Sequence, residues 1–145
     1  MNSSRLDGLN LTRDLFLGGK IALWQGAQGY RAGIDPVLLA AFLEPKFSQK
    51  ILDLGCGVGA VSLCLLAHHP NVFVTGLENV KQFVTLAERN AQENNFSDRF
   101  IPILGSVADV PSDIAPNAFD LVISNPPYAA AGTTKVSAYP NFCSY

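Results

Sequence analysis

The stretch ILDLGCGVG, residues 51–59, decides the fold. Its first four residues form a short apolar segment that suits a buried strand. Three glycines follow at alternate positions, Gly55, Gly57 and Gly59, and residues 60–67 then have a helical composition. A strand that turns into a helix through glycines is typical of open α/β sheets, which bind ligands at the carboxyl ends of their strands.

The alternation of strand and helix continues along the chain. The predicted strands cover residues 51–54, 72–77, 100–104 and 119–124, and the predicted helices cover residues 37–43, 60–67 and 80–91. Strands separated by helices indicate a parallel sheet with right-handed crossovers. Because proline cannot donate a hydrogen bond to a neighbouring strand, Pro102 assigns the third predicted strand to a sheet edge.

The N-terminal residues have a different character. Residues 1–31 read as coil followed by a short hairpin around the Gly18-Gly19 turn. Asp35-Pro36 marks the start of a helix, with Asp35 as the predicted N-cap. The predicted division is an N-terminal appendage at residues 1–34, an α/β domain at residues 35–128 and an irregular tail at residues 129–145.

Composition excludes several classes of protein. The chain has 145 residues, 48% of them hydrophobic, which is enough for the core of one domain and excludes a disordered chain. The longest apolar run, Val37–Leu43, is far short of the roughly 20 residues of a membrane-spanning helix. Three cysteines without metal-type spacing predict reduced thiols, no metal site and a cytoplasmic location. Without a basic stripe, nucleic acid is expected only as a transient substrate.

Glu78, at the end of the second predicted strand, suits a ribose-binding role, because its carboxylate can accept hydrogen bonds from two hydroxyl groups. Two cofactors fit this arrangement. Gly55-x-Gly57-x-x-Ala60 matches the dinucleotide pattern. S-adenosylmethionine (SAM) is favoured by Asp53, by the third glycine, and by the motif after the fourth predicted strand.

That motif is Asn125-Pro126-Pro127-Tyr128, at the same end of the sheet as the glycines. The Asn125 side-chain oxygen and the Pro126 carbonyl can both accept hydrogen bonds from one amino group, and Tyr128 can stack a base. An exocyclic base amine is poorly nucleophilic, so two acceptors that orient it would promote methyl transfer by positioning and electrostatics.

The combination of DLGCGVG, Glu78 and NPPY resembles the class I SAM-dependent methyltransferases that modify adenine or guanine amino groups. The upstream stretch FLGGKIALWQGAQGYRAGIDPVLLAAF is similar to the bacterial small-domain methyltransferases, especially the valine-tRNA adenine-N6 group. The resemblance covers residues 12–128. It implies a Rossmann-like α/β fold with an incomplete parallel sheet in the order 3-2-1-4, and methyl transfer from SAM to adenine N6 in tRNA.

The resemblance also implies a set of site residues. The implied cofactor-binding residues are Tyr30, Asp35, Asp53, Gly55, Cys56, Gly57, Gly59, Glu78, Asn79, Ser106, Val107 and Asn125. The implied base-binding residues are Asn125, Pro126, Pro127 and Tyr128. Residues 30–35 would close over the cofactor, although Asp35 is explained equally well as a helix cap. Cys56 is interpreted as a small side chain that fills the loop, and Phe83 as a core residue.

The chain departs from the family pattern at two places. Ser106 stands where the family usually has an aspartate that contacts the adenine of SAM. The tail after residue 128 does not resemble the expected continuation, so we expect a shortened version of a longer enzyme. The fourth strand would then be an exposed apolar edge that favours self-association.

Three alternative functions remain open at this point. NPPY also serves enzymes that methylate a protein glutamine amide. A non-catalytic remnant that binds SAM or a partner is compatible with a missing second half. A dinucleotide-binding module is disfavoured by Asp53 and by NPPY.

Overall fold

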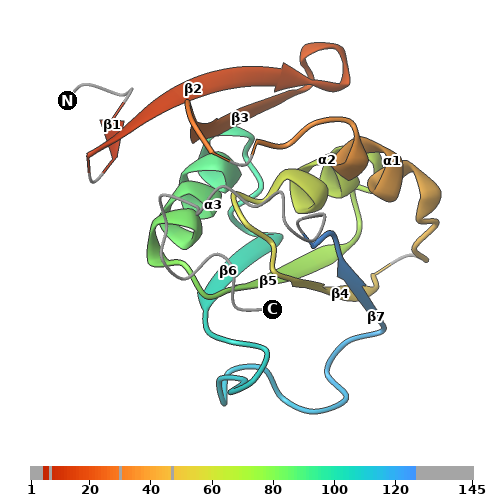
Figure 1. The fold of residues 1–145 in the computed structure, drawn as a ribbon. Helices are drawn as coiled ribbons and strands as arrows, with labels where there is room; N and C mark the ends of the chain where they lie inside the picture. The colour runs from red at the N-terminus through yellow and green to blue at the C-terminus, as the bar shows by residue number, and fades with distance from the viewer. Residues whose placement is uncertain (1–4, 7, 30, 47, 127–145) are drawn as a thin grey trace, which may run out of the picture.

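The computed structural model describes residues 5–6, 8–29, 31–46 and 48–126. These residues form a small antiparallel sheet, a four-stranded parallel sheet and three α-helices (Figure 1). The elements are β1 (Arg5–Leu6), β2 (Leu9–Phe16), a 3₁₀ turn (Leu17–Gly19), β3 (Ile21–Gly26), α1 (Asp35–Phe42), β4 (Lys50–Leu54), α2 (Ala60–His68), β5 (Phe73–Glu78), α3 (Lys81–Glu93), β6 (Phe100–Leu104) and β7 (Leu121–Ser124).

The parallel sheet has the order β6-β5-β4-β7, which confirms the predicted order 3-2-1-4. β4 lies inside the sheet, between β5 and β7, and Ile51 and Leu52, on its opposite faces, are both buried. Pro102 lies opposite Gly76 in β6, and β6 is an edge strand, as the proline predicted.

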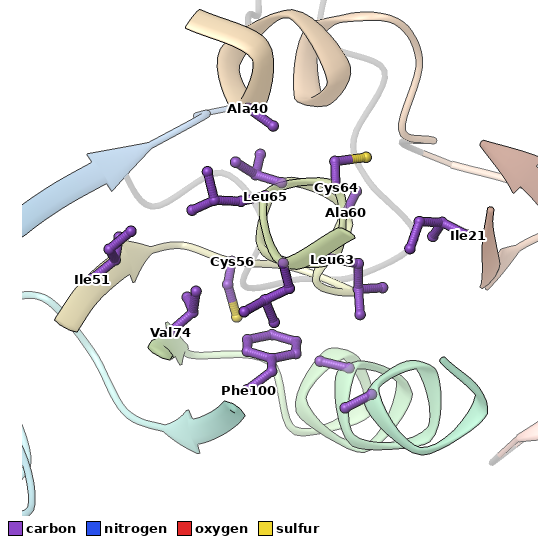
Figure 2. Packing of buried hydrophobic residues seen from close by; sticks show 14 of the residues in the cluster. Ile21, Ala40, Ile51, Cys56, Ala60, Leu63, Cys64, Leu65, Val74 and Phe100 are labelled. Carbon is purple, nitrogen blue, oxygen red and sulfur yellow. The ribbon is translucent and has the colours of Figure 1, made fainter. Parts of the chain in front are cut away.

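One face of the sheet carries the main hydrophobic core, which α2 and α3 cover (Figure 1). Figure 2 shows Phe100 close to Cys56 and Val74 and below Leu63 of α2. α2 is buried almost all round, because it lies between the sheet and α1. Its composition therefore contrasts with that of α3, which has one apolar stripe.

The other face has a thinner cover. Leu52 and Leu77 pack there against Ile114, which belongs to the long connection between β6 and β7. Within the described residues no helix lies on this face. Ile101 and Val122 remain 56% and 55% exposed at its two sides.

The N-terminal hairpin differs from the prediction in extent. The predicted turn is present, but β2 begins at Leu9, so much of the segment that we predicted as coil is a strand. Its many polar side chains obscured an alternation in which Leu11 is buried. Figure 1 shows the hairpin on the far side of α3 from the parallel sheet.

Smaller corrections concern the ends of elements. The predicted N-cap at Asp35 is wrong: Ile34 is the N-cap, and Asp35 is the first helical residue, without a side-chain cap. Its carboxylate still interacts favourably with the helix dipole. β5 begins at Phe73 and β7 at Leu121, slightly later than predicted. In the part of the chain that the structure describes, no helix is long and apolar enough to span a membrane.

Candidate active site

A cavity of about 360 Å³ lies at the carboxyl ends of β4, β5 and β7. The end of β3 and the segment that leads to α1 border it on the N-terminal side, through Gln25, Gly26, Gln28, Ala32 and Pro36. Its lining is mostly apolar with a few polar groups, and its volume is within the range of small-molecule sites. The sequence placed the site at this end of the sheet, and the cavity is found there.

The glycine loop leaves part of its backbone open to the cavity. Gly55 and Gly57 have φ angles of +68° and +55°, and a Cβ at either position would meet no atom within 4 Å. The loop is tied to β5, because the N–H groups of Gly55 and Cys56 both donate to the Leu77 carbonyl, at 2.8 and 3.2 Å. A ligand can therefore approach a fixed backbone that carries no side chains at these two positions.

Gly59 serves the packing of the core. Its φ is +88°, and a Cβ there would come within 2.6 Å of the Phe100 ring. It does not line the cavity, in contrast to the other two glycines of the loop.

The Glu78 carboxylate is held on both sides by backbone groups. The Gly57 N–H donates to Oε2 and the Val80 N–H donates to Oε1, each at 2.9 Å. Only 6% of Glu78 is exposed, and it lines the cavity. Since a carboxylate accepts about four hydrogen bonds, both oxygens retain capacity for hydroxyl groups of a ligand.

Asp53 lies buried beneath the same cavity, with an exposed fraction of 1%. The pKa of Asp53 is raised to about 7: burial is the largest cause, a hydrogen bond from Ser62 acts against it, and the nearby charge of Glu78 adds to the rise. This carboxyl group therefore titrates near neutral pH, where the ordinary aspartate is fully ionised.

The Cys56 side chain is buried against β5. Its sulfur occupies the space that a side chain at Gly76 would need. Burial raises the pKa of the thiol well above its usual range, and the charges of Asp53 and Glu78 act in the same direction. A thiol that stays protonated suits the predicted loop-filling role better than that of a nucleophile.

The fourth-strand corner reaches the cavity through Ser124, Asn125 and Pro126. The Ser124 hydroxyl donates to the Leu54 carbonyl at 2.9 Å, which joins the end of β7 to the start of the glycine loop. Pro127 and Tyr128, which we predicted to contact the base, lie outside the described residues, as does Tyr30.

The remaining predicted residues divide into two groups. Asn79 and Val107 line the cavity. Asp35 and Ser106 do not: Asp35 is exposed in the first turn of α1, and the Ser106 hydroxyl accepts a hydrogen bond from the Ala108 N–H at 3.2 Å. Their neighbours Pro36 and Val107 occupy the lining instead.

Several side chains of the lining were missed or misassigned from sequence, and Phe83 and Gln25 show why. Phe83, interpreted as core, is half-buried and lines the cavity from the first turn of α3. Its proximity in sequence to Glu78 was the available signal. Gln25 is 2% exposed, accepts from the Ala32 N–H at 2.9 Å and donates to Asp14 at 2.8 Å, and nothing in the sequence pattern indicated it.

Arg31 straps the segment above the cavity to the hairpin. Its guanidinium donates to the Gly26 carbonyl at 2.7 Å, to the Thr12 hydroxyl at 2.8 Å and to the Asp14 carboxylate at 2.6 Å. Partial burial alone would raise the pKa of Asp14, but hydrogen bonds from Gln25 and Thr12 and the charge of Arg31 lower it below 3.8.

The sequence and structure are similar to those of known methyltransferases. The sequence profile of the methyltransferase small domain matches residues 32–144, more than half of the chain. A tRNA1(Val) (adenine(37)-N6)-methyltransferase of Porphyromonas gingivalis is 35% identical over 121 residues, which are 79% of this chain and 48% of that protein. The release factor glutamine methyltransferase of Escherichia coli is 38% identical over 84 residues, 58% of this chain and 29% of that protein.

Among solved structures, a Methanococcus maripaludis protein assigned as an S-adenosyl-L-methionine-dependent methyltransferase superposes with a TM-score of 0.56 at 26% identity. The match covers 63% of this chain and 41% of that one. The chain thus has the predicted Rossmann-like fold, and it spans about half the length of the curated tRNA methyltransferases that it matches.

Proposed function

Because the chain belongs to the methyltransferase small-domain family, we propose that the cavity binds SAM and that the protein transfers a methyl group to an exocyclic amine. The observation that carries this proposal is that one cavity is bordered both by the Glu78-anchored glycine loop and by the Asn125-Pro126 corner. The first can hold a nucleoside cofactor, and the second can receive an amine.

The residues present fit SAM. The Glu78 carboxylate, already fixed by two N–H groups, suits the ribose hydroxyls. The open backbone at Gly55 and Gly57 suits the methionine portion. The apolar side chains of Phe83 and Val107 suit the adenine ring. When bound, SAM supplies an electrophilic methyl group.

The chain's own part in the reaction is to orient the amine. The Asn125 side-chain oxygen and the Pro126 carbonyl accept hydrogen bonds from its two N–H groups and direct the nitrogen lone pair into the cavity. Pro126 has no N–H group, so the corner offers acceptors without a competing donor at this residue. Such positioning needs no covalent intermediate.

We propose adenine N6 in tRNA as the substrate. The tRNA methyltransferase relative matches 79% of this chain, whereas the glutamine methyltransferase relative matches 58%. A protein glutamine amide is the alternative substrate, and a non-catalytic SAM-binding remnant is the alternative role. The contact with the substrate RNA is transient, because a chain with a net charge of −2 lacks the excess of positive charge that strong nonspecific binding of nucleic acid needs.

The proposal includes a cytoplasmic setting and self-association. Cys56 and Cys64 are buried free thiols, which suits a reducing compartment. β7 pairs with β4 alone among the described strands, and Val122 on it is 55% exposed, so a second chain can pair there.

Calorimetric titration of the chain with SAM, and separately with NAD, tests the cofactor assignment. We expect SAM binding that Glu78→Ala abolishes and that Glu88→Ala, which removes an exposed acid on α3, preserves. Binding of NAD alone, or no SAM binding by a chain shown to be folded, would overturn the proposal.

Methylation assays then separate the substrates. Methyl incorporation into tRNA that Asn125→Ala abolishes supports the tRNA assignment, and incorporation only into a release-factor glutamine supports the alternative. SAM binding without either product identifies a non-catalytic remnant.

A further inference from the structure

Two asparagines on α3 attach the N-terminal hairpin to the rest of the molecule. Asn90 Oδ1 accepts from the Trp24 N–H at 2.7 Å, and its Nδ2 donates to the Trp24 carbonyl at 2.9 Å. Asn94, one turn later, makes the same pair of bonds with Ala22, at 2.9 and 2.7 Å. The two amides thus take the place of a neighbouring strand along the edge of β3 that does not face β2.

The third hydrogen bond differs between the two residues. Asn90 Nδ2 also donates to the Val58 carbonyl in the glycine loop, at 2.9 Å. Asn94 Nδ2 donates instead to the Asn90 carbonyl within its own helix, at 2.7 Å. Asn90 is fully buried, and both of its amide hydrogens are used, so it connects β3, α3 and the glycine loop at one point.

The loop carbonyl that Asn90 holds is at a sensitive place. Val58 lies between Gly57 and Gly59, whose φ angles are +55° and +88°. The Gly57 N–H is one of the two groups that hold the Glu78 carboxylate. The Val58 carbonyl lies two peptide units further along the same turn, so losing its hydrogen bond would loosen the turn that places this N–H group beside the candidate ribose-binding carboxylate.

We propose that Asn90 is a positioning residue for the cofactor site. It holds the Gly57–Gly59 turn in the conformation that reaches Glu78. It also couples this turn to the position of the hairpin on α3, because the same side chain bonds Trp24 of β3. The hairpin in turn carries Gln25 and Gly26, which line the opposite side of the cavity. The part of this inference that concerns cofactor affinity rests on the proposed function, whereas the part that concerns the loop does not.

Hydrogen exchange of the ligand-free chain tests the loop. Asn90→Ala and Asn94→Ala each remove one pair of hydrogen bonds to β3, but only Asn90→Ala removes the hydrogen bond to the loop. Asn94→Ala is therefore the matched control. We expect Asn90→Ala to speed exchange of the Gly57 and Gly59 amides by roughly fivefold or more, with Asn94→Ala within about twofold of the parent chain. Equal changes in the two variants would overturn the proposal.

Titration with SAM tests the consequence. At a temperature where both variants are folded, Asn90→Ala should bind SAM roughly 2- to 10-fold more weakly than Asn94→Ala. If the alanine variant does not fold, Asn90→Asp keeps the shape and the acceptor for Trp24 but loses both donors, and we expect the same loop-specific exchange from it.

The outcomes separate this inference from the proposed function. If the parent chain binds no SAM but Asn90→Ala alone speeds exchange of the loop amides, the cofactor assignment is overturned and Asn90 still stands as the residue that orders the loop. A parent chain that binds SAM, with both variants alike in affinity and exchange, overturns the role of Asn90.

Discussion

The Ser62 hydroxyl donates to Asp53 Oδ2 at 2.7 Å, and both side chains are buried beneath the cavity. Asp53 is the last residue but one of β4 and Ser62 lies in the first turn of α2, so the pair spans the glycine loop. One hydroxyl does not compensate for the loss of water around a carboxylate, which is why the pKa rises to about 7. The two ends of the loop are therefore joined by a hydrogen bond whose acceptor, the Asp53 carboxyl group, changes its protonation state near pH 7.

Asp53→Asn should change how stability depends on pH. Because the pKa of Asp53 is raised from 3.8 to about 7, the folded chain binds a proton between these values that the unfolded chain releases. The contribution of Asp53 to stability therefore falls as pH rises from about 4 to about 7 and is constant above that.

Urea denaturation at pH 5 and pH 8 measures this effect. The free energy of unfolding of Asp53→Asn minus that of the parent chain should be larger at pH 8 than at pH 5, by about 1 kcal/mol or more. Asp98→Asn, at an exposed aspartate, should show no such difference. Parallel pH curves for Asp53→Asn and the parent would contradict the prediction.

Gly59→Ala should destabilise the fold by roughly 2–4 kcal/mol. The substitution combines a left-handed backbone with a Cβ only 2.6 Å from the Phe100 ring. Gly33→Ala is the matched control, because a Cβ at Gly33 meets nothing within 4 Å and its φ is not positive. Chemical denaturation of the two variants compares them, and an equal, small effect would show that the core yields at Phe100.

Arg31→Ala should weaken both the fold and SAM binding. The variant loses the three contacts that strap the segment above the cavity to the hairpin, and because this site is partly exposed we expect about 1–2 kcal/mol of destabilisation. Since Arg31 helps to lower the pKa of Asp14, the difference from the parent should shrink as pH falls below 3.8.

Thermal melts and SAM titrations check this, with Lys20→Ala, at an exposed lysine of the hairpin turn, as the control. An Arg31→Ala variant with the affinity of the control would show that the strap does not influence the cavity.

Val122→Lys should reduce self-association of the chain. A lysine on the exposed face of β7 opposes edge pairing by charge. Leu15→Lys, at a residue 61% exposed on the hairpin, is the control, since it changes charge equally at another site. Light scattering over a range of concentrations gives the mass of each variant. A parent chain that stays monomeric at high concentration would refute the association itself.

The sequence predicted those parts of the molecule that local patterns determine. The strand, glycine loop and helix around residues 51–67, the acid at Glu78 and the edge position of Pro102 each follow from residue type and spacing. The parallel order confirmed in the structure follows from the alternation of elements together with the family resemblance.

The residues that escaped prediction act through distant partners. Asn90 contacts Trp24 across 66 positions, and an asparagine on a helix carries no signal for that contact. Phe83 fits an apolar helix stripe and a cavity wall equally well, so periodicity could not separate the two. Strand β2 escaped prediction because Asn10 and Thr12, on either side of the buried Leu11, are polar.

The two edge strands of the parallel sheet, β6 and β7, differ in how well they can pair with a further strand. A strand approaching β6 meets Pro102, which offers no N–H group, whereas β7 has no proline. We therefore expect a further strand, from this chain or another, to pair with β7 rather than with β6. Such a strand would extend the sheet beside the corner that carries Asn125.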